Sequence, residues 1–402
     1  MSKLIITKME ISGHPCTVCA LEEGGKVMEL RLEQTGTASL LGNIYIGQVE
    51  NMAANIQAAF VRLPDGIKGY FPLAEQHQLI YTCGRKGEAP LRAGDEILVQ
   101  VSRDAMKGKL PALTANLNFT GKYLVLTTGN KKFGLSSRLS RESKNLLCKW
   151  LQEEIEQPNK AYGLVVRTNA AEATKEELLH ELSYLKQQYE KVAVQGRYRT
   201  CFSCLYEAEP FYLSALRDVY DRNLEAVQTD EEEIFSHLDS YMEDFCPEQK
   251  EKLSFYKDSL LPLHKLYRLE SALDEIRQEK IWLKSGGFLV IQQTEAFVSI
   301  DVNSGKYTGK KKAEETYRKI NLEAAKEIAR QLRLRNLSGI ILIDFINMEH
   351  PDHKDELFHV LAKEIRRDPV KGKVIDFTAL NIMEMTRKKV RRPVLEDLKS
   401  LY

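Results

Sequence analysis

Two aspartates that close apolar stretches are the residues of this sequence best suited to chemistry. Asp301 follows the run AFVSI, and Asp344 follows GIILI. The segment between them has helical periodicity over about 313–335, which predicts a strand–helix–strand unit. If the two strands are parallel, both carboxylates lie at one edge of the sheet, where open α/β sheets bind ligands.

Such a pair of acids favours metal binding. Two carboxylates at close range repel each other unless a cation compensates, and Mg²⁺ favours sites with one or two carboxylates, several waters and substrate phosphate oxygens. Asn303 adds a neutral polar group beside Asp301. A single aspartate of this kind is more simply a helix cap or a strand-end turn residue. Two of them, joined by one helix, favour a metal site.

The lysine-rich segment GKYTGKKK follows Asn303 and offers positive charge to phosphates through Lys306 and residues 310–312. It is not a phosphate-binding P-loop, because only three residues separate Gly305 from Gly309 and no Ser or Thr follows the lysines. A solvated loop and a contact to substrate phosphates remain two open interpretations of this segment.

The elements around these residues predict a multidomain α/β protein. Residues from 41 to about 123 contain about five short alternating strands separated by turns, which is typical of a small OB-type barrel. The next segment predicts a strand (YGLVVRT), then a helix over about 172–191, then another strand (TCFSCLYE). Residues 211–275 have mainly helical periodicity. From 281 the pattern is α/β again, with two hairpin strands before Asp301 and a helix over about 354–367.

The bulk properties exclude several classes of protein. The 402 residues suffice for several modules, and 58 Lys+Arg against 57 Asp+Glu give no global attraction to nucleic acid, so any polyanion must bind to local patches. The N-terminus has no signal-peptide pattern, and no apolar run could span a membrane. We therefore expect a soluble, cytoplasmic protein.

The seven cysteines do not predict a disulfide framework, since their number is odd. Two pairs have CxxC spacing, Cys16/Cys19 and Cys201/Cys204, which is a possible four-thiolate zinc site. Both pairs lie in strand-like runs without the Gly-rich turns of zinc knuckles. We interpret them as strand cysteines and expect no structural zinc.

The segment TEAFVSIDVNSGKYTG, continued by EETYRKINLEAAKEIARQLRLRNLSGIILIDFINM, closely resembles the signature of the ribonuclease E/G family. The resemblance extends back through NIYIGQVENMAANIQAAFVRLPDGIKGYFPL and YGLVVRT and forward to IMEMTRKKVRR, and so covers essentially the whole chain. It is strongest over 281–349.

The resemblance implies an RNase-H-like subdomain interrupted by an OB-type RNA-binding barrel and a 5′-sensor module, followed by a deoxyribonuclease-I-like catalytic subdomain. The implied boundaries are 1–40 and 215–280 for the two parts of the RNase-H-like subdomain, 41–122 for the barrel, 123–214 for the sensor and 281–402 for the catalytic subdomain.

The resemblance also implies roles for individual residues. In the family the two strand-end acids bind the catalytic Mg²⁺ with support from the nearby Asn, which assigns catalytic roles to Asp301, Asp344 and Asn303. A 5′-monophosphate would bind to Arg167, Thr168 and the backbone N–H of Leu135. Single-stranded RNA would contact Phe60, Tyr70, Lys109 and Lys306. From the pattern alone, Phe60 could equally be a core residue, whereas the alternation in GYFPL favours an exposed Tyr70.

Two departures from the family pattern stand in the sequence. After RRPVLEDLKSLY there is no CPxC zinc link and no small C-terminal domain, so both a monomer and a homodimer are compatible with the sequence. Asn347 stands where the family often has Asp, which would weaken metal affinity if that acid supports the metal.

These observations predict a Mg²⁺-dependent endoribonuclease that cuts single-stranded RNA, prefers 5′-monophosphorylated ends, leaves a 5′-phosphate and a 3′-hydroxyl, and acts in RNA processing and decay. A non-catalytic RNA-binding regulator with the same fold is the alternative. A metal-dependent deoxyribonuclease or phosphatase is less compatible with a barrel suited to single strands.

Overall fold

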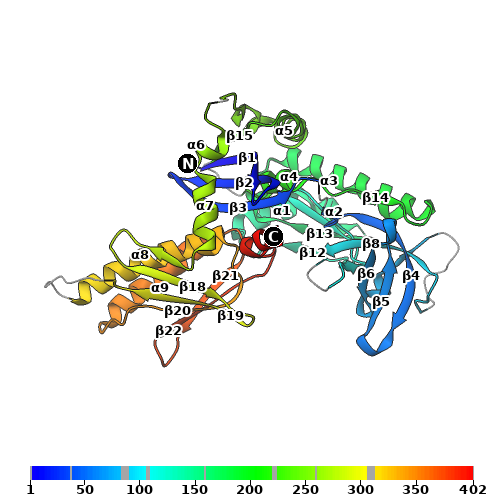
Figure 1. The fold of residues 1–402 in the computed structure, drawn as a ribbon. Coiled ribbons are helices and arrows are strands. Elements are labelled where there is room, and N and C mark those ends of the chain that lie inside the picture. The colour runs from blue at the N-terminus through cyan, green and yellow to red at the C-terminus, as the bar shows by residue number, and fades with distance from the viewer. Residues whose placement is uncertain are drawn as a thin grey trace. The chain divides into compact units, whose positions relative to one another are not determined.

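The computed structural model describes residues 2–36, 39–82, 90–105, 109–157, 160–219, 224–258, 260–305 and 313–401. The chain forms two compact units (Figure 1). The split unit comprises Met1–Thr37 and Val219–Tyr402, and the inserted unit comprises Ala38–Asp218. None of the helices in the described ranges is both long and apolar enough to cross a membrane.

A closed five-stranded barrel forms the first part of the inserted unit. Its strands are β4 (Ile44–Ala53), β5 (Ala58–Arg62), β6 (Lys68–Pro72), β9 (Ala112–Thr114) and β8 (Glu96–Arg103), and the ring closes because β8 also pairs with β4. β7 (Ile80–Tyr81) and β14 (Cys204–Tyr206) extend the sheet. Alternate residues such as Val61 and Phe71 fill the interior, so the predicted barrel is confirmed.

The second sheet of the inserted unit has the order β10 (Asn118–Thr120), β11 (Leu124–Thr127), β13 (Gly163–Val166), β12 (Phe133–Leu135). The helices of this unit are α1 (Arg141–Trp150), α2 (Gln152–Glu156), α3 (Lys175–Tyr189) and α4 (Phe211–Asp218). α3 begins later than the predicted 172, because Thr174 and Glu177 form a capping box at its N-terminus. Its buried Glu181 accepts N–H bonds from Lys122, Tyr123 and Leu124 and so ties the helix to the sheet.

The first sheet of the split unit joins segments that are far apart in the sequence. Its order is β16 (Leu253–Phe255), β15 (Leu224–Thr229), β1 (Ser2–Ile11), β2 (His14–Glu23), β3 (Lys26–Gln34), with β1 parallel to β15. Its helices are α5 (Glu232–Phe245), α6 (Leu263–Leu266), α7 (Leu269–Arg277) and α10 (Val394–Ser400). The prediction that 211–275 is mainly helical missed β15 and β16, because β15 forms against the distant β1 and β16 forms against β15.

The second sheet of the split unit carries the predicted strand–helix–strand unit. Its order is β17 (Lys280–Trp282), β18 (Phe288–Gln293), β19 (Phe297–Asn303), β20 (Gly339–Asp344), β22 (Ile382–Arg387), β21 (Gly372–Phe377). α8 (Ala313–Leu334) connects β19 to β20, and α9 (Pro351–Arg367) follows β20. Both helices pack on one face of this sheet, where Ile300, Ile343 and Ile328 share one core (Figure 1).

Candidate active site and RNA-binding residues

Asp301 and Asp344 lie side by side on neighbouring strands. β19 and β20 are parallel, which meets the condition of the sequence-based expectation, and the two aspartates are register partners. Since neighbouring strands lie about 4.8 Å apart, both carboxylates rise from one small area of the sheet. The carboxylate of Asp301 accepts a 2.5 Å hydrogen bond from Nδ2 of Asn303, which is also on β19. The structure therefore brings the three predicted catalytic residues together.

The face from which these side chains project follows from the strand alternation. Val298, Ile300 and Val302 of β19 are buried in the core that the sheet shares with α8 and α9. Asp301 and Asn303 alternate with them and so point to the opposite face, as Asp344 does next to the buried Ile343. We call this the open face of the sheet. Both aspartates are exposed there.

One detail differs from the sequence-based expectation. β19 does not end at Asp301 but continues to Asn303, because Asn303 still pairs with Phe288 of β18. Asp301 therefore projects from the sheet surface and does not lie in a crevice beyond the strand ends, whereas Asp344 is the last residue of β20. Asn347, which departs from the family pattern, is exposed three residues further on.

The two carboxylates lack nearby positive partners in the described part of the chain. Neither Asp301 nor Asp344 forms an ion pair with a Lys or Arg that the structure describes. Two adjacent unpaired carboxylates repel each other, and a hard divalent cation with water ligands would relieve that repulsion. The predicted RNA contact Lys306 and the lysines at 310–312 lie outside the described residues.

The predicted RNA-binding aromatics are neighbours on the outside of the barrel. Phe60 of β5 and Tyr70 of β6 are register partners, and both are half-buried. Their chain neighbours Ala59 and Phe71 fill the barrel core, so Phe60 and Tyr70 point outward. The backbone N–H of Tyr70 donates to Pro111, two residues after the exposed Lys109. Phe60 is thus an outward-facing residue and not a core residue.

The predicted phosphate sensor lies where β12 and β13 end. Leu135 is the register partner of Val166, which directly precedes Arg167 and Thr168. The Thr168 hydroxyl is 2.8 Å from the Ser136 hydroxyl, and the Ser136 N–H donates to Val166. The parallel pairing of two short strands therefore brings Leu135, Arg167 and Thr168 together, although Leu135 and Val166 are 31 positions apart in the chain.

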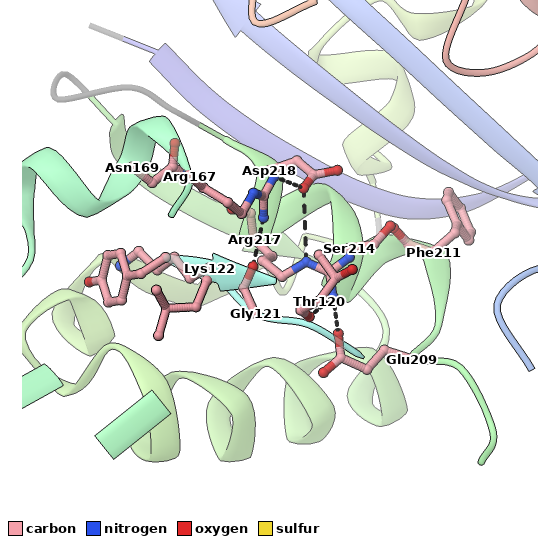
Figure 2. Close-up of polar contacts among 12 residues, drawn as sticks. Thr120, Gly121, Lys122, Arg167, Asn169, Glu209, Phe211, Ser214, Arg217 and Asp218 are labelled. Carbon is pink, nitrogen blue, oxygen red and sulfur yellow. Dashed lines mark hydrogen bonds and ion pairs between the residues drawn. The ribbon is translucent and has the colours of Figure 1, made fainter. Parts of the chain in front are cut away.

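The Arg167 guanidinium is held by partners that no sequence pattern indicated. Nη1 donates to the Gly121 carbonyl at 2.7 Å, and Nη2 donates to the Asp218 carboxylate at 2.8 Å (Figure 2). The neighbouring Arg217 donates to the Thr120 carbonyl and to Glu209, both at 2.9 Å. Burial raises the pKa of Glu209, and Arg217 opposes that shift. A phosphate that binds to Arg167 must share this guanidinium with Asp218.

The model of the ribonuclease E/G family matches residues 118–390, which is more than half of the chain. Curated relatives match over a longer range. Ribonuclease G of Escherichia coli K12 is 32% identical over 389 residues, which cover 94% of this chain and 78% of that protein.

The chain belongs to the ribonuclease E/G family. Ribonuclease G of Haemophilus influenzae is 32% identical over 385 residues, covering 93% of this chain and 78% of that protein. Ribonuclease E of a Nostoc species is 31% identical over 361 residues, covering 89% of this chain and 52% of that longer protein. The family resemblance of the sequence is thereby confirmed.

Sequence reasoning missed Asp218, Arg217 and Gly121, which surround Arg167. Asp218 is 51 residues away from Arg167 in the chain and ends the helix α4. The Arg–Asp pair in ALRDVY looks like an ordinary charged helix terminus, so only the tertiary contact distinguishes it. Gly121 contacts Arg167 through its backbone carbonyl, which every residue has, so no sequence pattern could have indicated it.

The cysteines agree only partly with their interpretation as strand residues. Cys16 and Cys19 are buried in β2, and burial raises the pKa of Cys19 to about 12, which disfavours the thiolate that zinc needs. Cys204 begins β14, but Cys201 lies in the preceding turn, where Phe202 has φ +67°. The expectation that the protein has no structural zinc stays a prediction.

Proposed function

We propose that this protein is a metal-dependent endoribonuclease that hydrolyses single-stranded RNA and acts in RNA processing and decay. Its relatives named ribonuclease G and ribonuclease E support the reaction class. The observation that carries the proposal is the pairing of Asp301 with Asp344 across two parallel strands, on the open face of a sheet. The RNA strand would lie along that face.

The donor set fits Mg²⁺ as the ion. Asp301 and Asp344 would hold it, and the remaining positions would go to water and to phosphate oxygens. Asn303 donates a hydrogen bond to one oxygen of the Asp301 carboxylate and would hold that carboxylate in place for the ion. A bound divalent ion would lower the pKa of a water molecule and stabilise negative charge on the scissile phosphate. Hydrolysis would leave a 5′-phosphate and a 3′-hydroxyl.

The other predicted residues would bind the strand around the cut. Bases would stack on Phe60 and Tyr70, because aromatic rings accept any base of a single strand, and Lys109 would contact the backbone. In the subdomain assignment that we propose, the barrel is the OB-type domain (41–122), 123–214 is the sensor, 1–40 with 215–280 is the RNase-H-like subdomain and 281–402 is deoxyribonuclease-I-like.

The test of the nuclease is cleavage of an end-labelled AU-rich RNA with a 5′-monophosphate, in Mg²⁺ and in EDTA. We expect Mg²⁺-dependent internal cuts by the wild type. Asp301→Asn and Asp344→Asn should each lower kcat/KM by about 100-fold or more, because each removes a charged group that stabilises the transition state. Asp352→Asn, which changes an exposed acid at the start of α9, should cleave like the wild type.

Two further measurements separate the nuclease from the alternative, a non-catalytic RNA-binding regulator. Calorimetric titration with Mn²⁺ should show one site in the wild type and weaker binding in Asp344→Asn. Fluorescence anisotropy of labelled RNA should show similar RNA affinity in both proteins. RNA binding without any cleavage in Mg²⁺ would favour the regulator, and full activity of either Asn variant would refute the metal assignment.

We also propose that Arg167, Thr168 and the backbone N–H of Leu135 bind a 5′-monophosphate. A terminal phosphate offers more charge and more oxygens to an Arg fork than an internal diester does. Arg167→Ala should reduce the ratio of cleavage rates for 5′-monophosphorylated and 5′-hydroxyl RNA to about one. An unchanged ratio would refute the sensor role and leave the nuclease assignment intact.

A further inference from the structure

The open face of the catalytic sheet carries two aromatic rings that its core does not need. Ile281 of β17 and Leu289 of β18 are buried under the helices, so their chain neighbours Trp282 and Phe288 point to the open face. Trp282 and Phe288 are register partners, and we call them the ring pair. Trp282 is 64% exposed, and Phe288 is half-buried.

The two rings of the pair pack against each other at an angle, and a lysine contacts both of them. The ring centroids are 5.3 Å apart and the ring planes are inclined by 59°. The Lys280 ammonium lies 4.3 Å from the Trp282 centroid and 3.7 Å from the Phe288 centroid, so it makes cation–π contacts with both rings. A large exposed tryptophan beside a cation is a combination that favours nucleobases and phosphates.

A pocket extends from the ring pair to Asn303, the neighbour of the carboxylate site. It has a volume of about 530 Å³, and it is lined by Lys280, Trp282, Ser285, Gly286, Phe288, Asn303, Ser304 and Gly305. Asn303 is the residue that donates to Asp301. The Ser285 hydroxyl has no hydrogen-bond partner in the described ranges, so a rotation of its side chain could offer it to a ligand.

The sheet register gives the spacing between the two features. Trp282 pairs with Phe288, and Phe288 pairs with Asn303, so these residues form one row across three strands. In the adjacent row, Lys280 pairs with Val290, Val290 with Asp301, and Asp301 with Asp344. Phe288 lies on β18 and Asp301 lies on the neighbouring strand β19, in the adjacent row. Since neighbouring strands are about 4.8 Å apart, the ring pair begins one strand away from the strand that carries Asp301. A strand of RNA whose phosphate lies at Asp301 and that runs toward β17 would therefore pass close to the rings.

We propose that the ring pair is a base-stacking subsite, in which Trp282 and Phe288 hold the nucleobase next to the scissile phosphate and Lys280 contacts the RNA backbone. This inference rests on the proposed nuclease function and assigns part of its substrate recognition. The simpler role, a hydrophobic cover for the edge strand β17, does not require Trp282 to be largely exposed. The stacking role uses the face of the ring that solvent reaches.

Tryptophan fluorescence tests the subsite without any cleavage. The chain has two tryptophans, Trp150 and Trp282, so Trp150→Phe leaves Trp282 as the single reporter. In the double variant Trp150→Phe, Asp344→Asn, titration with single-stranded RNA should quench the emission of Trp282 with saturation, because a stacked base quenches an indole. The anisotropy of labelled RNA, measured in the same samples, should rise over the same concentration range.

The outcomes separate the two proposals. A rise in anisotropy without quenching would overturn the subsite and leave the nuclease assignment intact. Failure of the RNA to bind to the wild type would overturn both.

Cleavage by the otherwise wild-type chain gives the second readout. Trp282→Ala should lower kcat/KM for single-stranded RNA by about tenfold, within the range expected for the loss of stacking on one ring, while Trp282→Phe retains most of the activity. RNA with one abasic nucleotide beside the cut should lose about the same factor with the wild type and little with Trp282→Ala. Equal loss in both proteins, or wild-type activity of Trp282→Ala, would overturn the subsite. Urea midpoints of the variants exclude loss of folding as the cause.

Discussion

At the scale of single residues, the Asp218 carboxylate limits what the Arg167 guanidinium can bind. It already accepts a 2.8 Å hydrogen bond from Nη2, and the side chains of Arg167 and Asp218 are only 25% and 35% exposed. A phosphate near Arg167 therefore gains the attraction of the guanidinium but is repelled by Asp218. The pair tunes the affinity for a terminal phosphate, if the sensor works as proposed.

Asp218→Asn tests that tuning. The amide can still accept from Arg167 but carries no charge, so we expect the preference for 5′-monophosphorylated over 5′-hydroxyl RNA to rise several-fold. The measurement is the ratio of the two cleavage rates, with the exposed Glu153→Gln as a control acid of the same unit. A lower ratio would mean that Asp218 orients Arg167 for the phosphate and that this orientation outweighs the repulsion.

Asp397 makes the stability of the folded chain depend on pH. Burial raises the pKa of Asp397 in α10 from 3.8 to about 6, so the folded state holds this proton more tightly than the unfolded chain does. The contribution is therefore favourable below pH of about 4, is lost as the pH rises to about 6, and stays lost above that. Asp397→Asn should raise the urea midpoint at pH 7.5 and change it little at pH 4. An equal change at both pH values would contradict this account.

At the scale of elements, two glycines with positive φ, Gly286 and Gly305, line the pocket next to Asn303 and determine its backbone shape. Gly305, after β19, has φ +65°, and a Cβ added to it would collide with the backbone carbonyl of Gly286. Gly286, in the β17–β18 turn, has φ +90°, but a Cβ added to it would point into open space. Gly305 therefore packs directly on the β17–β18 hairpin, and only glycine permits that approach.

Replacing each glycine by alanine separates backbone strain from the collision. Gly286→Ala should cost about 1–2 kcal/mol of folding free energy, the strain of a left-handed residue. Gly305→Ala should cost more, because its methyl group also displaces a backbone carbonyl. Urea denaturation of both variants measures the difference. Equal destabilisation of the two variants would mean that the backbone at residue 305 shifts away from the Gly286 carbonyl without a cost in folding free energy.

Element prediction succeeded where the pattern was local. The barrel strands β4, β5, β6 and β8, the β18–β19 hairpin and α8 were predicted close to their observed bounds, because alternation and helical periodicity are properties of contiguous residues. The fifth barrel strand was predicted wrongly: YLVL belongs to β11 of the second sheet, and the short β9 closes the barrel in its place. The strands β15 and β16 were missed within a segment predicted to be mainly helical. β15 becomes a strand through pairing with β1, which lies more than two hundred residues earlier, and the three residues of β16 then pair with β15.

At the scale of the whole molecule, the inserted unit is continuous in sequence and has its own cores. Its barrel core and the core between its second sheet and α3 consist of residues from within 38–218. A domain with its own core can fold alone. The split unit, in contrast, needs both of its chain segments, because β1 pairs with β15 across the insertion.

We therefore expect a fragment of residues 38–218 to fold by itself. It should show a cooperative urea transition and should bind single-stranded RNA through the barrel, without cleaving it, because Asp301 and Asp344 are absent. Circular dichroism and RNA anisotropy measure both properties, with Phe60→Ala as the variant that should weaken binding. A fragment without a cooperative transition would show that the unit depends on the rest of the chain.

The sequence by itself determined the candidates for chemistry. The apolar stretches that lead to Asp301 and Asp344, with a helix between them, predicted a strand–helix–strand unit that brings the two acids together if its strands are parallel, since these patterns reflect local rules of strand and helix formation. Tertiary structure alone decided the surroundings. Asp218 beside Arg167, and the row from Trp282 to Asn303, arise from pairing between segments distant in sequence, and no local pattern encodes which distant group a side chain will meet.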